Sequence, residues 1–410
     1  MTVSDAQRVV ITGIGALAAN GDSAERHWAA TQAGRSGIVP IGRFDASGYP
    51  TRLGGEIRDF DARGRVPRRL LPQTDRVTQY ALAAAEEALE DARIDPSRYD
   101  RYDLGVITAS GCGGFEFGQR ELQKLWSEGP QRVSAYQSFA WFYAVNTGQL
   151  SIRHGMRGHS SVVVAEQAGG LDALAAARRQ VRRGTVRVAL AGGLDAPLSP
   201  WGLTAQIPNG LLSEADDPRR AYLPFDRRAS GYVPGEGGAL LVLEPASAAH
   251  ERGAPTVYGE VAGYAATFDP PPHSGRGPNL ASAIRGALRD AGTDPAEIDA
   301  VCADAAGLPD RDAEEAAALV EVFGRRAVPV TAPKTLIGRT YSGGGPLDVI
   351  SALLMMRDGV IPPTAHVGEV PDDYGIDLVL GDPRARPVRR VLVVARGHGG
   401  FNAALVLTRT

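Results

Sequence analysis

Residues 162–174 read Val-Val-Val-Ala-Glu-Gln-Ala-Gly-Gly-Leu-Asp-Ala-Leu. The apolar run 162–164 predicts a buried strand, and the paired glycines predict a turn before a helix over 170–183. A turn of this kind presents its central residue at a helix N-terminus, where the dipole favours negative charge. That residue is Gln167. Because an amide is neither a nucleophile nor a base, the architecture of a nucleophile elbow is present without its nucleophile.

Strands and helices alternate along the rest of the chain. Short apolar runs predict strands over residues 8–15, 104–108, 162–164 and 186–190. Helix-favouring composition and periodicity predict helices over residues 24–33, 78–92, 115–126, 138–152 and 170–183. This alternation favours a mostly parallel sheet that is covered by helices on both faces. The first strand is expected to open into a loop at Gly13-Ile14-Gly15, which lacks the third glycine of a dinucleotide-binding site.

One short segment recurs in the second half of the chain. Residues 88–100 (Ala-Leu-Glu-Asp-Ala-Arg-Ile-Asp-Pro-Ser-Arg-Tyr-Asp) and 287–299 (Ala-Leu-Arg-Asp-Ala-Gly-Thr-Asp-Pro-Ala-Glu-Ile-Asp) match at seven of thirteen positions. Each segment ends a predicted helix and turns at Asp-Pro before a predicted strand. Two similar turns of independent origin would explain the match, but an ancient duplication explains it better. We therefore expect two α/β halves, over residues 1–253 and 254–410, packed as one unit.

Composition excludes several classes of protein. Of the 410 residues, 43% are apolar and 22% are charged, as in globular proteins and unlike disordered or fibrous ones. A net charge of −3 offers no basic surface for nucleic acid, and no apolar run is long enough to span a membrane. Residues 1–7 are polar and do not resemble a signal peptide. Two cysteines cannot build a disulfide framework, so the chain is predicted to be cytoplasmic and reduced.

Two further apolar strands lead into polar residues that could support chemistry. The first is followed by Asp304, Asp312 and Glu315, and Asp304 alone could equally cap a turn. The second leads to Lys334, one of only two lysines among 44 basic residues, which could pair with Glu315 or lie on the surface.

The remaining candidate groups point to no metal site or cofactor. His398 stands alone in a glycine-rich turn, without the spacing of metal ligands. Cys112 and Cys302 have no neighbouring base, so both are predicted to be buried apolar residues.

Together these segments resemble the condensing enzymes of the thiolase fold, the β-ketoacyl synthases. The stretch Pro224-Phe-Asp-Arg-Arg-Ala-Ser-Gly-Tyr-Val-Pro-Gly-Glu-Gly237 matches that family closely, and the resemblance runs from Arg8 to Leu407. It implies an α/β, thiolase-like fold of two duplicated halves in α-β-α-β-α layers. The family carries a cysteine at the elbow and one histidine in each of two later motifs.

This sequence departs from the family at the catalytic positions. Gln167 replaces the cysteine, and Asp304 and Arg339 replace the two histidines. The supporting residues of the family remain as Lys334, Asp312 and Glu315. The glutamine elbow and the aromatic segment 138–149 together resemble, more specifically, the chain length factor, or ketosynthase β subunit, of bacterial type II aromatic polyketide synthases.

The resemblance implies a subunit without condensing activity, which pairs with a catalytic ketosynthase α subunit and, through it, with acyl carrier protein and a growing poly-β-ketone. An elbow glutamine also resembles loading ketosynthases that decarboxylate malonyl units to make an acetyl primer, although those enzymes keep both histidines. A scaffolding protein unrelated to polyketides is the third alternative.

Two groups of residues are expected to serve this role. The aromatic side chains Phe139, Trp141, Phe142 and Tyr143 would border the partner, or else lie in the core of this chain. Phe115, Gly118 and Leu122 share one helix face, and the resemblance implies that this face lines the polyketide tunnel rather than ordinary core. Since glycine leaves room that a larger side chain would fill, we expect a product longer than an octaketide, of roughly nine to twelve ketide units.

Overall fold

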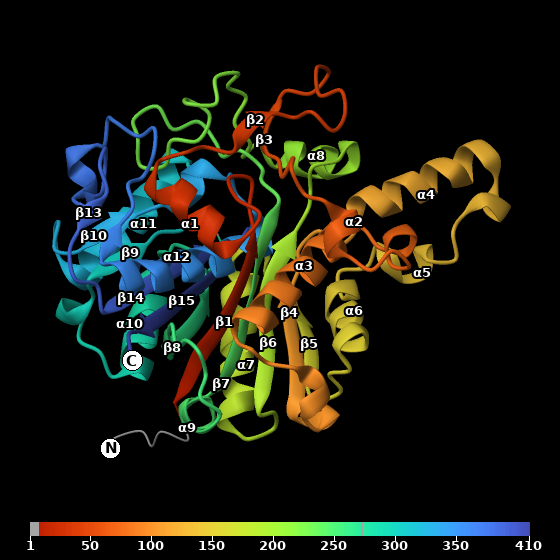
Figure 1. Ribbon diagram of the computed structural model, residues 1–410. Helices are drawn as coiled ribbons and strands as arrows, with labels where there is room; N and C mark the ends of the chain where they lie inside the picture. Colours follow the sequence, from red (N-terminus) through yellow and green to blue (C-terminus); the bar gives the residue numbers. More distant parts are fainter. Residues whose placement is uncertain (1–7, 272–273) are drawn as a thin grey trace.

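The computed structural model describes residues 8–271 and 274–410, so the prediction about residues 1–7 lies outside the described residues. Figure 1 shows its helices and strands. The strands are β1 (Val9–Leu17), β2 (Ile38–Pro40), β3 (Leu53–Gly55), β4 (Leu104–Ala109), β5 (Ser160–Val163), β6 (Val188–Asp195), β7 (Gly237–Pro245), β8 (Gly259–Phe268), β9 (Ala300–Cys302), β10 (Pro329–Thr331), β11 (Val360–Ile361), β12 (Asp377–Leu378), β13 (Arg384–Ala385), β14 (Arg390–Arg396) and β15 (Phe401–Thr408). The α-helices are α1 (Ala24–Gln32), α2 (Ala62–Arg65), α3 (Arg76–Asp91), α4 (Phe115–Glu128), α5 (Gln137–Ala140), α6 (Val145–His154), α7 (Glu166–Arg182), α8 (Pro200–Gln206), α9 (Ala246–Glu251), α10 (Leu280–Ala291), α11 (Pro309–Phe323) and α12 (Gly344–Asp358).

Eleven strands form one sheet in the order β12-β10-β9-β14-β15-β8-β1-β7-β6-β4-β5. The two halves of this sheet repeat one topology, because β1, β7, β6, β4 and β5 correspond in order to β8, β15, β14, β9 and β10. Among the described strands of each half, neighbours are parallel except where β7 or β15 takes part. The prediction of a mostly parallel sheet is therefore right within each half apart from one reversed strand.

The repeated sequence segments occupy equivalent places in the two halves. Residues 88–100 end α3, pass through a 3₁₀ turn at Pro96–Arg98 and approach β4. Residues 287–299 end α10, pass through a 3₁₀ turn at Pro295–Glu297 and enter β9. Matching topology around matching sequence supports duplication over two turns of independent origin.

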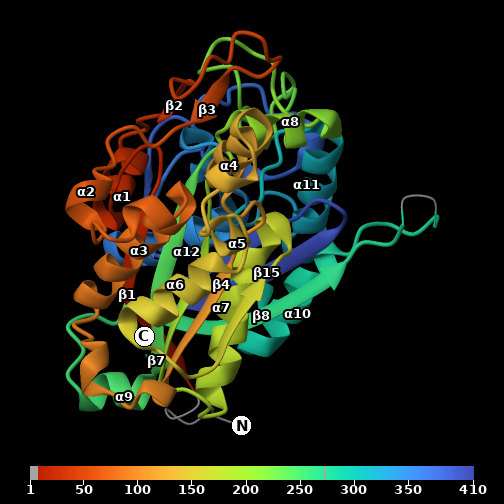
Figure 2. The same cartoon turned by 90° about the vertical axis from the view of Figure 1, so that its right-hand side faces the viewer.

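Helices and half-sheets stack in five layers (Figures 1 and 2). The central helices α7 and α12 share one hydrophobic core with residues from both half-sheets. Helix α3 packs on the outer face of the N-terminal half-sheet, and α10 and α11 pack on that of the C-terminal half-sheet. The α-β-α-β-α arrangement implied by the resemblance is confirmed.

Glycines account for two departures from the predicted elements. Strand β1 continues to Leu17 instead of opening into a loop, since Gly13 and Gly15 let α3 approach: added Cβ atoms would lie 2.1 Å from Ala88 O and 2.0 Å from Ala84 O. Helix α7 begins at Glu166, before the paired glycines and not after them. A Cβ at Gly170 would lie 2.3 Å from Pro346 Cδ, so this glycine allows close packing against α12.

The aromatic segment 138–152 forms two helices, α5 and α6, instead of one. Between them, the carbonyl of Trp141 accepts a hydrogen bond from the N–H of Gly114 (3.0 Å), outside any helix. Helix α4 and the segment that returns through α5 project from the body as an arm (Figures 1 and 2). Among the described helices, none has the length and apolar character needed to cross a membrane.

Candidate functional site

The elbow lies between β5 and α7. Gln167 is fully buried in the first turn of α7, and neither atom of its amide has a hydrogen-bond partner. The amide lies against Gly344 at the start of α12, where an added Cβ would be 2.2 Å from Nε2. The residue with the left-handed backbone is Glu166 (φ +47°) and not Gln167, which corrects the predicted centre of the turn.

Asp304 and Arg339, which the resemblance matches to the two histidines of the condensing enzymes, form an ion pair. Arg339 Nη2 lies 3.1 Å from both carboxylate oxygens of Asp304, and both side chains are at most 5% exposed. The same nitrogen donates to the carbonyl of Arg396 (2.6 Å), and the guanidinium lies 5.6 Å from the ring centre of Tyr232. Burial disfavours the charge of Arg339, but the carboxylates of Asp304 and Glu166 outweigh it and raise the arginine's pKa well above its ordinary value.

The carboxylate of Asp304 does not cap the following turn, so that alternative is wrong. Besides Arg339, it accepts a hydrogen bond from the backbone N–H of Arg396 (2.8 Å). A carboxylate and a guanidinium that are paired in this way are poorly suited to take a proton from a substrate.

Two acidic residues of α11 hold the loop that carries Asp304. Glu315 accepts from the N–H groups of Asp304 (2.7 Å) and Ala305 (2.8 Å). Asp312 accepts from those of Phe225 (2.9 Å) and Gly307 (3.0 Å). Burial raises the pKa of each carboxyl to about 7, with a further increase from neighbouring acidic groups. Both residues support the loop through its backbone.

Lys334 is buried and pairs with Asp348 of α12, whose Oδ2 lies 2.6 Å from its Nζ. The ammonium also donates to the carbonyl of Ala303. Both alternatives from the sequence are therefore wrong: Lys334 does not lie on the surface, and its partner is Asp348 and not Glu315, whose oxygens accept backbone N–H groups. Burial raises the pKa of Asp348 to about 6, although Lys334 lowers it.

Both cysteines are buried, as predicted, and neither lies at the elbow. Burial raises the pKa of each thiol, and negative charge from Asp195 and Asp348 adds to the effect at Cys112 and Cys302 respectively. A protonated, enclosed thiol is a poor nucleophile.

A pocket of about 290 Å³ opens beside the elbow. Its lining includes Glu166, Tyr232, Arg339, Arg396 and His398. His398 is exposed, and its backbone N–H donates to a carboxylate oxygen of Glu166 (2.8 Å).

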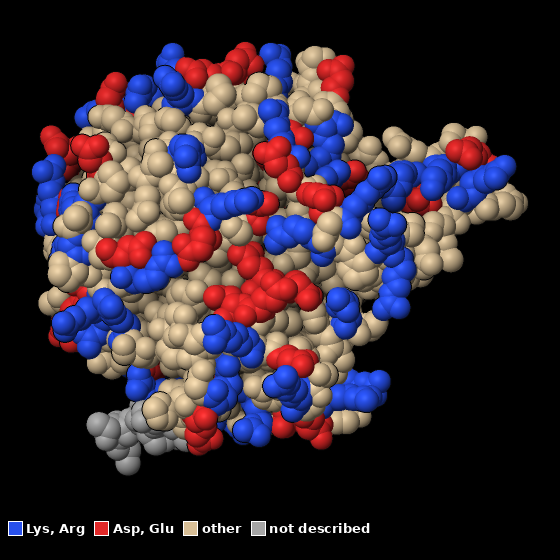
Figure 3. All heavy atoms as spheres, in the orientation of Figure 1, with Lys and Arg blue, Asp and Glu red and all other residues tan. Residues whose placement is uncertain are grey.

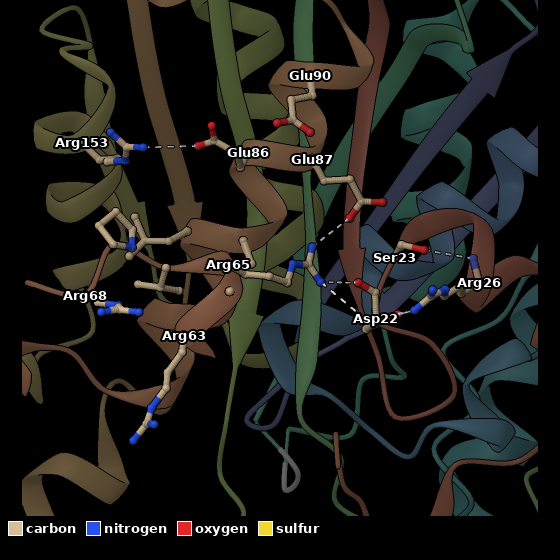
Figure 4. Close-up of a pocket in the computed structure, with 15 residues that line it drawn as sticks. Asp22, Ser23, Arg26, Arg63, Arg65, Arg68, Glu86, Glu87, Glu90 and Arg153 are labelled. Atoms are coloured by element: carbon tan, nitrogen blue, oxygen red, sulfur yellow. Dashed lines mark hydrogen bonds and ion pairs between the residues drawn. The ribbon is translucent and has the colours of Figure 1, made fainter. Parts of the chain in front are cut away.

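A separate hollow of about 800 Å³ lies between α2 and α3 (Figure 4). Several of its charged groups pair with one another: Arg65 lies 3.9 Å from Asp22 and 3.8 Å from Glu87, and Arg153 lies 3.9 Å from Glu86. None of the site residues predicted from the sequence lines it.

The face of α4 that carries Phe115, Gly118 and Leu122 meets Trp201 at the start of α8. The rings of Phe115 and Trp201 stack with centroids 5.1 Å apart and planes 18° apart. An added Cβ at Gly118 would lie 2.9 Å from Trp201 Cζ3 and 3.2 Å from Trp141 Cβ. Leu122 is half-buried one turn further along. The expectation of open room beside Gly118 is therefore wrong, since the indole of Trp201 fills it.

Sequence reasoning missed Trp201. Its own context, after Ser199 and Pro200, signals only a helix start, and the Ser199 side chain does accept from the N–H of Gly202. Its backbone N–H donates to the side-chain oxygen of Gln119 (2.8 Å), which ties α8 to α4. No local pattern predicts a contact across about eighty residues.

The aromatic side chains of segment 138–149 form a surface on the arm. Trp141, Phe142 and Tyr143 are 43%, 39% and 39% exposed, and Phe139 is half-buried, so the alternative that they lie in this chain's core is wrong. In Figure 3 charged side chains of both signs are interspersed over the body, and uncharged ones cover the underside of the arm. Nearby, β5 lies at the edge of the sheet, and Val164 just beyond it is 49% exposed.

Comparison with known proteins agrees with this geometry. Residues 6–249 match the β-ketoacyl synthase N-terminal domain, and residues 258–368 match the C-terminal domain. The tetracenomycin polyketide synthase ketoacyl synthase beta subunit of Streptomyces glaucescens is 64% identical over 401 residues, 98% of each chain. The actinorhodin polyketide putative beta-ketoacyl synthase 2 of Streptomyces coelicolor is 61% identical over the same length, again 98% of each chain.

Solved structures show the same fold over almost the whole chain. The ishigamide ketosynthase/chain length factor superposes with a TM-score of 0.90 at 29% identity, covering 98% of this chain and 99% of that one. A β-ketoacyl synthase from Burkholderia phymatum gives the same TM-score and coverage at 28% identity. The chain therefore belongs to the β-ketoacyl synthase family, and within it to the ketosynthase β subunits, or chain length factors, of type II polyketide synthases.

Proposed function

We propose that this chain is the non-condensing half of a ketosynthase heterodimer, in which it completes the polyketide tunnel and limits the length of the poly-β-ketone. The observation that carries the proposal is the elbow: a buried amide at Gln167 beside the Asp304–Arg339 ion pair. Acyl transfer needs a thiolate or an activated hydroxyl at this place. The condensing chemistry is accordingly assigned to a catalytic α subunit, which receives its substrates from acyl carrier protein.

The proposed interface joins the outer edge of β5 to the aromatic surface of Phe139, Trp141, Phe142 and Tyr143. An unpaired sheet edge presents a row of N–H and C=O groups that a second chain can complete. Exposed aromatic side chains supply the apolar contact area that stable interfaces need. A chain-length-factor relative is itself described together with its ketosynthase.

Two finer assignments belong to the same proposal. Residues 1–253 and 254–410 are the two duplicated halves, a division that agrees with the repeated topology. The protein works in the cytoplasm, where its two buried thiols remain reduced.

The gate of the tunnel is assigned to Phe115, Gly118 and Leu122 of α4 together with Trp201. Phe115 and Trp201 form a stacked wall, and Gly118 is the position at which the indole fits. A larger residue at position 118 must push the indole of Trp201 away from α4. Residues 118 and 201 together therefore determine how much free space lies beside this helix face.

Trp201→Ala should raise the ratio of longer to native-length products about tenfold, because the indole no longer closes the space beside Gly118. Gly118→Phe combined with Leu122→Phe should shift products toward shorter chains. Product lengths are measured by mass spectrometry with the co-expressed α subunit. Trp126→Ala, on the same arm but 77% exposed, is the matched control and should leave the lengths unchanged. Unaltered lengths in both gate variants, with an intact heterodimer, would place the gate elsewhere.

Gln167→Ala should lower total product by no more than about threefold, because the chemistry resides in the partner. Gln167→Leu, which keeps the volume without the amide, separates loss of packing from loss of polarity. Both variants are assayed for product in the reconstituted complex, together with mutation of the partner's elbow cysteine, which should abolish product.

One observation favours a second function, decarboxylation of malonyl units to an acetyl primer. Both amide atoms of Gln167 lack a partner in the described chain, and an amide can hold a thioester carbonyl while an enolate forms. Release of carbon dioxide from malonyl-carrier protein, lost in Gln167→Ala and Gln167→Leu alike, would establish it. The full burial of the side chain argues against access by substrate.

A further inference from the structure

Helix α4 begins without a cap of its own. Its N-cap residue is Gly114, so no side chain is available to accept the N–H groups of the first turn. A side chain cannot be placed there, because an added Cβ would lie 2.2 Å from Ala140 O and 2.8 Å from Asp75 Cβ. The gate residues Phe115 and Gly118 therefore stand on a helix end that must be held from outside.

Asp75 supplies the missing cap from a different helix. It is the N-cap of α3, where its Oδ1 accepts the N–H of Val77 (2.9 Å). Its Oδ2 accepts the N–H of Phe117 (2.7 Å), the third residue of α4 and the usual donor to an N-cap side chain. Asp75 is 2% exposed, so water does not replace either bond. The carboxylate of Asp75 thus caps the N-termini of both α3 and α4.

The two helices differ in how firmly they are held. Helix α3 packs through Val77, Tyr80 and Ala81 into the core of the N-terminal half, whereas α4 projects from the body. Arg76, the residue after Asp75, adds an ion pair to Glu116 in the first turn of α4 (3.0 Å). Helix α3, which the core holds in place, therefore fixes the start of the projecting helix α4 through the contacts of Asp75 and Arg76.

We propose that Asp75 is the positioning residue that fixes the start of α4 against Trp201. It thereby determines how narrow the distribution of product lengths is. The inference rests on the proposed function, since it requires that the α4 face limits the product. Without the bond to Phe117, the first turn of α4 can shift, and the stacking of Phe115 on Trp201 loosens. The consequence is a broader distribution of product lengths, not a slower synthase.

Asp75→Ser separates the two roles of the carboxylate. Serine is as good an N-cap as aspartate, so α3 keeps its cap, but its hydroxyl is one bond shorter and does not reach the N–H of Phe117. In the heterodimer with the α subunit, the ratio of off-length to native-length product should rise about tenfold, with total product within about twofold of the parent. Asp75→Asn keeps only one acceptor oxygen, so the N–H of Val77 or of Phe117 faces the amide NH2 instead, and the ratio should rise, though less than in Asp75→Ser.

Asp61→Ser is the matched control, because Asp61 caps the short helix α2 by accepting the N–H of Arg63 but is not the acceptor for the first turn of α4. It should leave the length distribution unchanged. If Asp75→Ser does not assemble with the α subunit, the ratio in Asp75→Asn decides, and an unchanged ratio there overturns the proposal.

Trp201→Ala in the same assay tests the gate itself, whereas Asp75→Ser tests the role of Asp75 in positioning it. A shift in Trp201→Ala with none in Asp75→Ser overturns the role of Asp75 and leaves the gate in place. No shift in either variant overturns both. A loss of total product in Asp75→Ser at constant length ratio marks Asp75 as a structural cap only, and this too overturns the proposal.

Discussion

A chain with proline in place of Val162 will fold but will not assemble with its catalytic partner, and product will fall more than about a hundredfold. The carbonyls of His159 and Val163 accept hydrogen bonds from Val106 (3.2 Å) and Ser110 (3.3 Å) on the β4 side. Since backbone groups of a strand alternate between its two edges, Val162 turns its N–H outward. Proline removes only that outward donor and leaves the pairing with β4 intact.

Size-exclusion chromatography with light scattering, on chains co-expressed with the α subunit, measures the assembly. Val162→Thr is the matched control, because it keeps the N–H and the preference for strand while making the side chain polar. A Val162→Pro chain that still elutes as a one-to-one heterodimer would show that the partner does not pair with the edge of β5.

The second large effect concerns the buried ion pair between Arg339 and Asp304. Arg339→Met leaves the carboxylate of Asp304 buried, with the N–H of Arg396 as its remaining donor. Breaking a buried pair by removing one partner costs about 3–5 kcal/mol. We expect a decrease of that size in the free energy of unfolding, measured by urea denaturation of the purified chain.

Removing both charges tests the cause of that loss. In Asp304→Asn with Arg339→Met the buried carboxylate is removed as well, and Glu166, the other carboxylate near Arg339, is 23% exposed to water, so at least about half of the lost stability should return. A double variant as unstable as Arg339→Met alone would mean that the guanidinium acts through its packing on Tyr232 and its bond to Arg396. Re-creating a condensing site from Gln167 alone is not expected to succeed while this pair fills the histidine positions.

The features that could be predicted from the sequence are those that depend only on residues close together in the chain. Residues 88–100 and 287–299 each carry the whole helix-turn-strand signal, so their equivalence in the two halves could be inferred before the sheet order was known. The motif around Gln167 likewise predicted a strand followed by a turn and a helix, although the turn centres on Glu166 and the helix starts there. In both cases short-range periodicity and turn chemistry determine the local structure.

The predictions that are wrong concern residues whose contacts come from distant parts of the chain. At these places the local sequence is compatible with more than one arrangement. Lys334 was expected to pair with Glu315 or to lie on the surface, but it is buried and pairs with Asp348 of α12, while Glu315 accepts backbone N–H groups. Gly170 has the signature of a turn, yet it lies within α7 because α12 packs against it. Gly118 suggests empty space, which Trp201 fills from another part of the chain. Each choice depends on packing that no local pattern contains.

The contact between Gly118 and Trp201 bears on how such subunits can be recombined. A chimera that imports only residues 115–128 from a relative would set a foreign side chain against an indole whose position depends on glycine. Importing residues 199–206 with them preserves the fit between α4 and α8, including the bond from Trp201 to Gln119. Under the proposed gate, the unit to exchange for a change of product length is therefore a matched pair of segments, separated in sequence and transferred together.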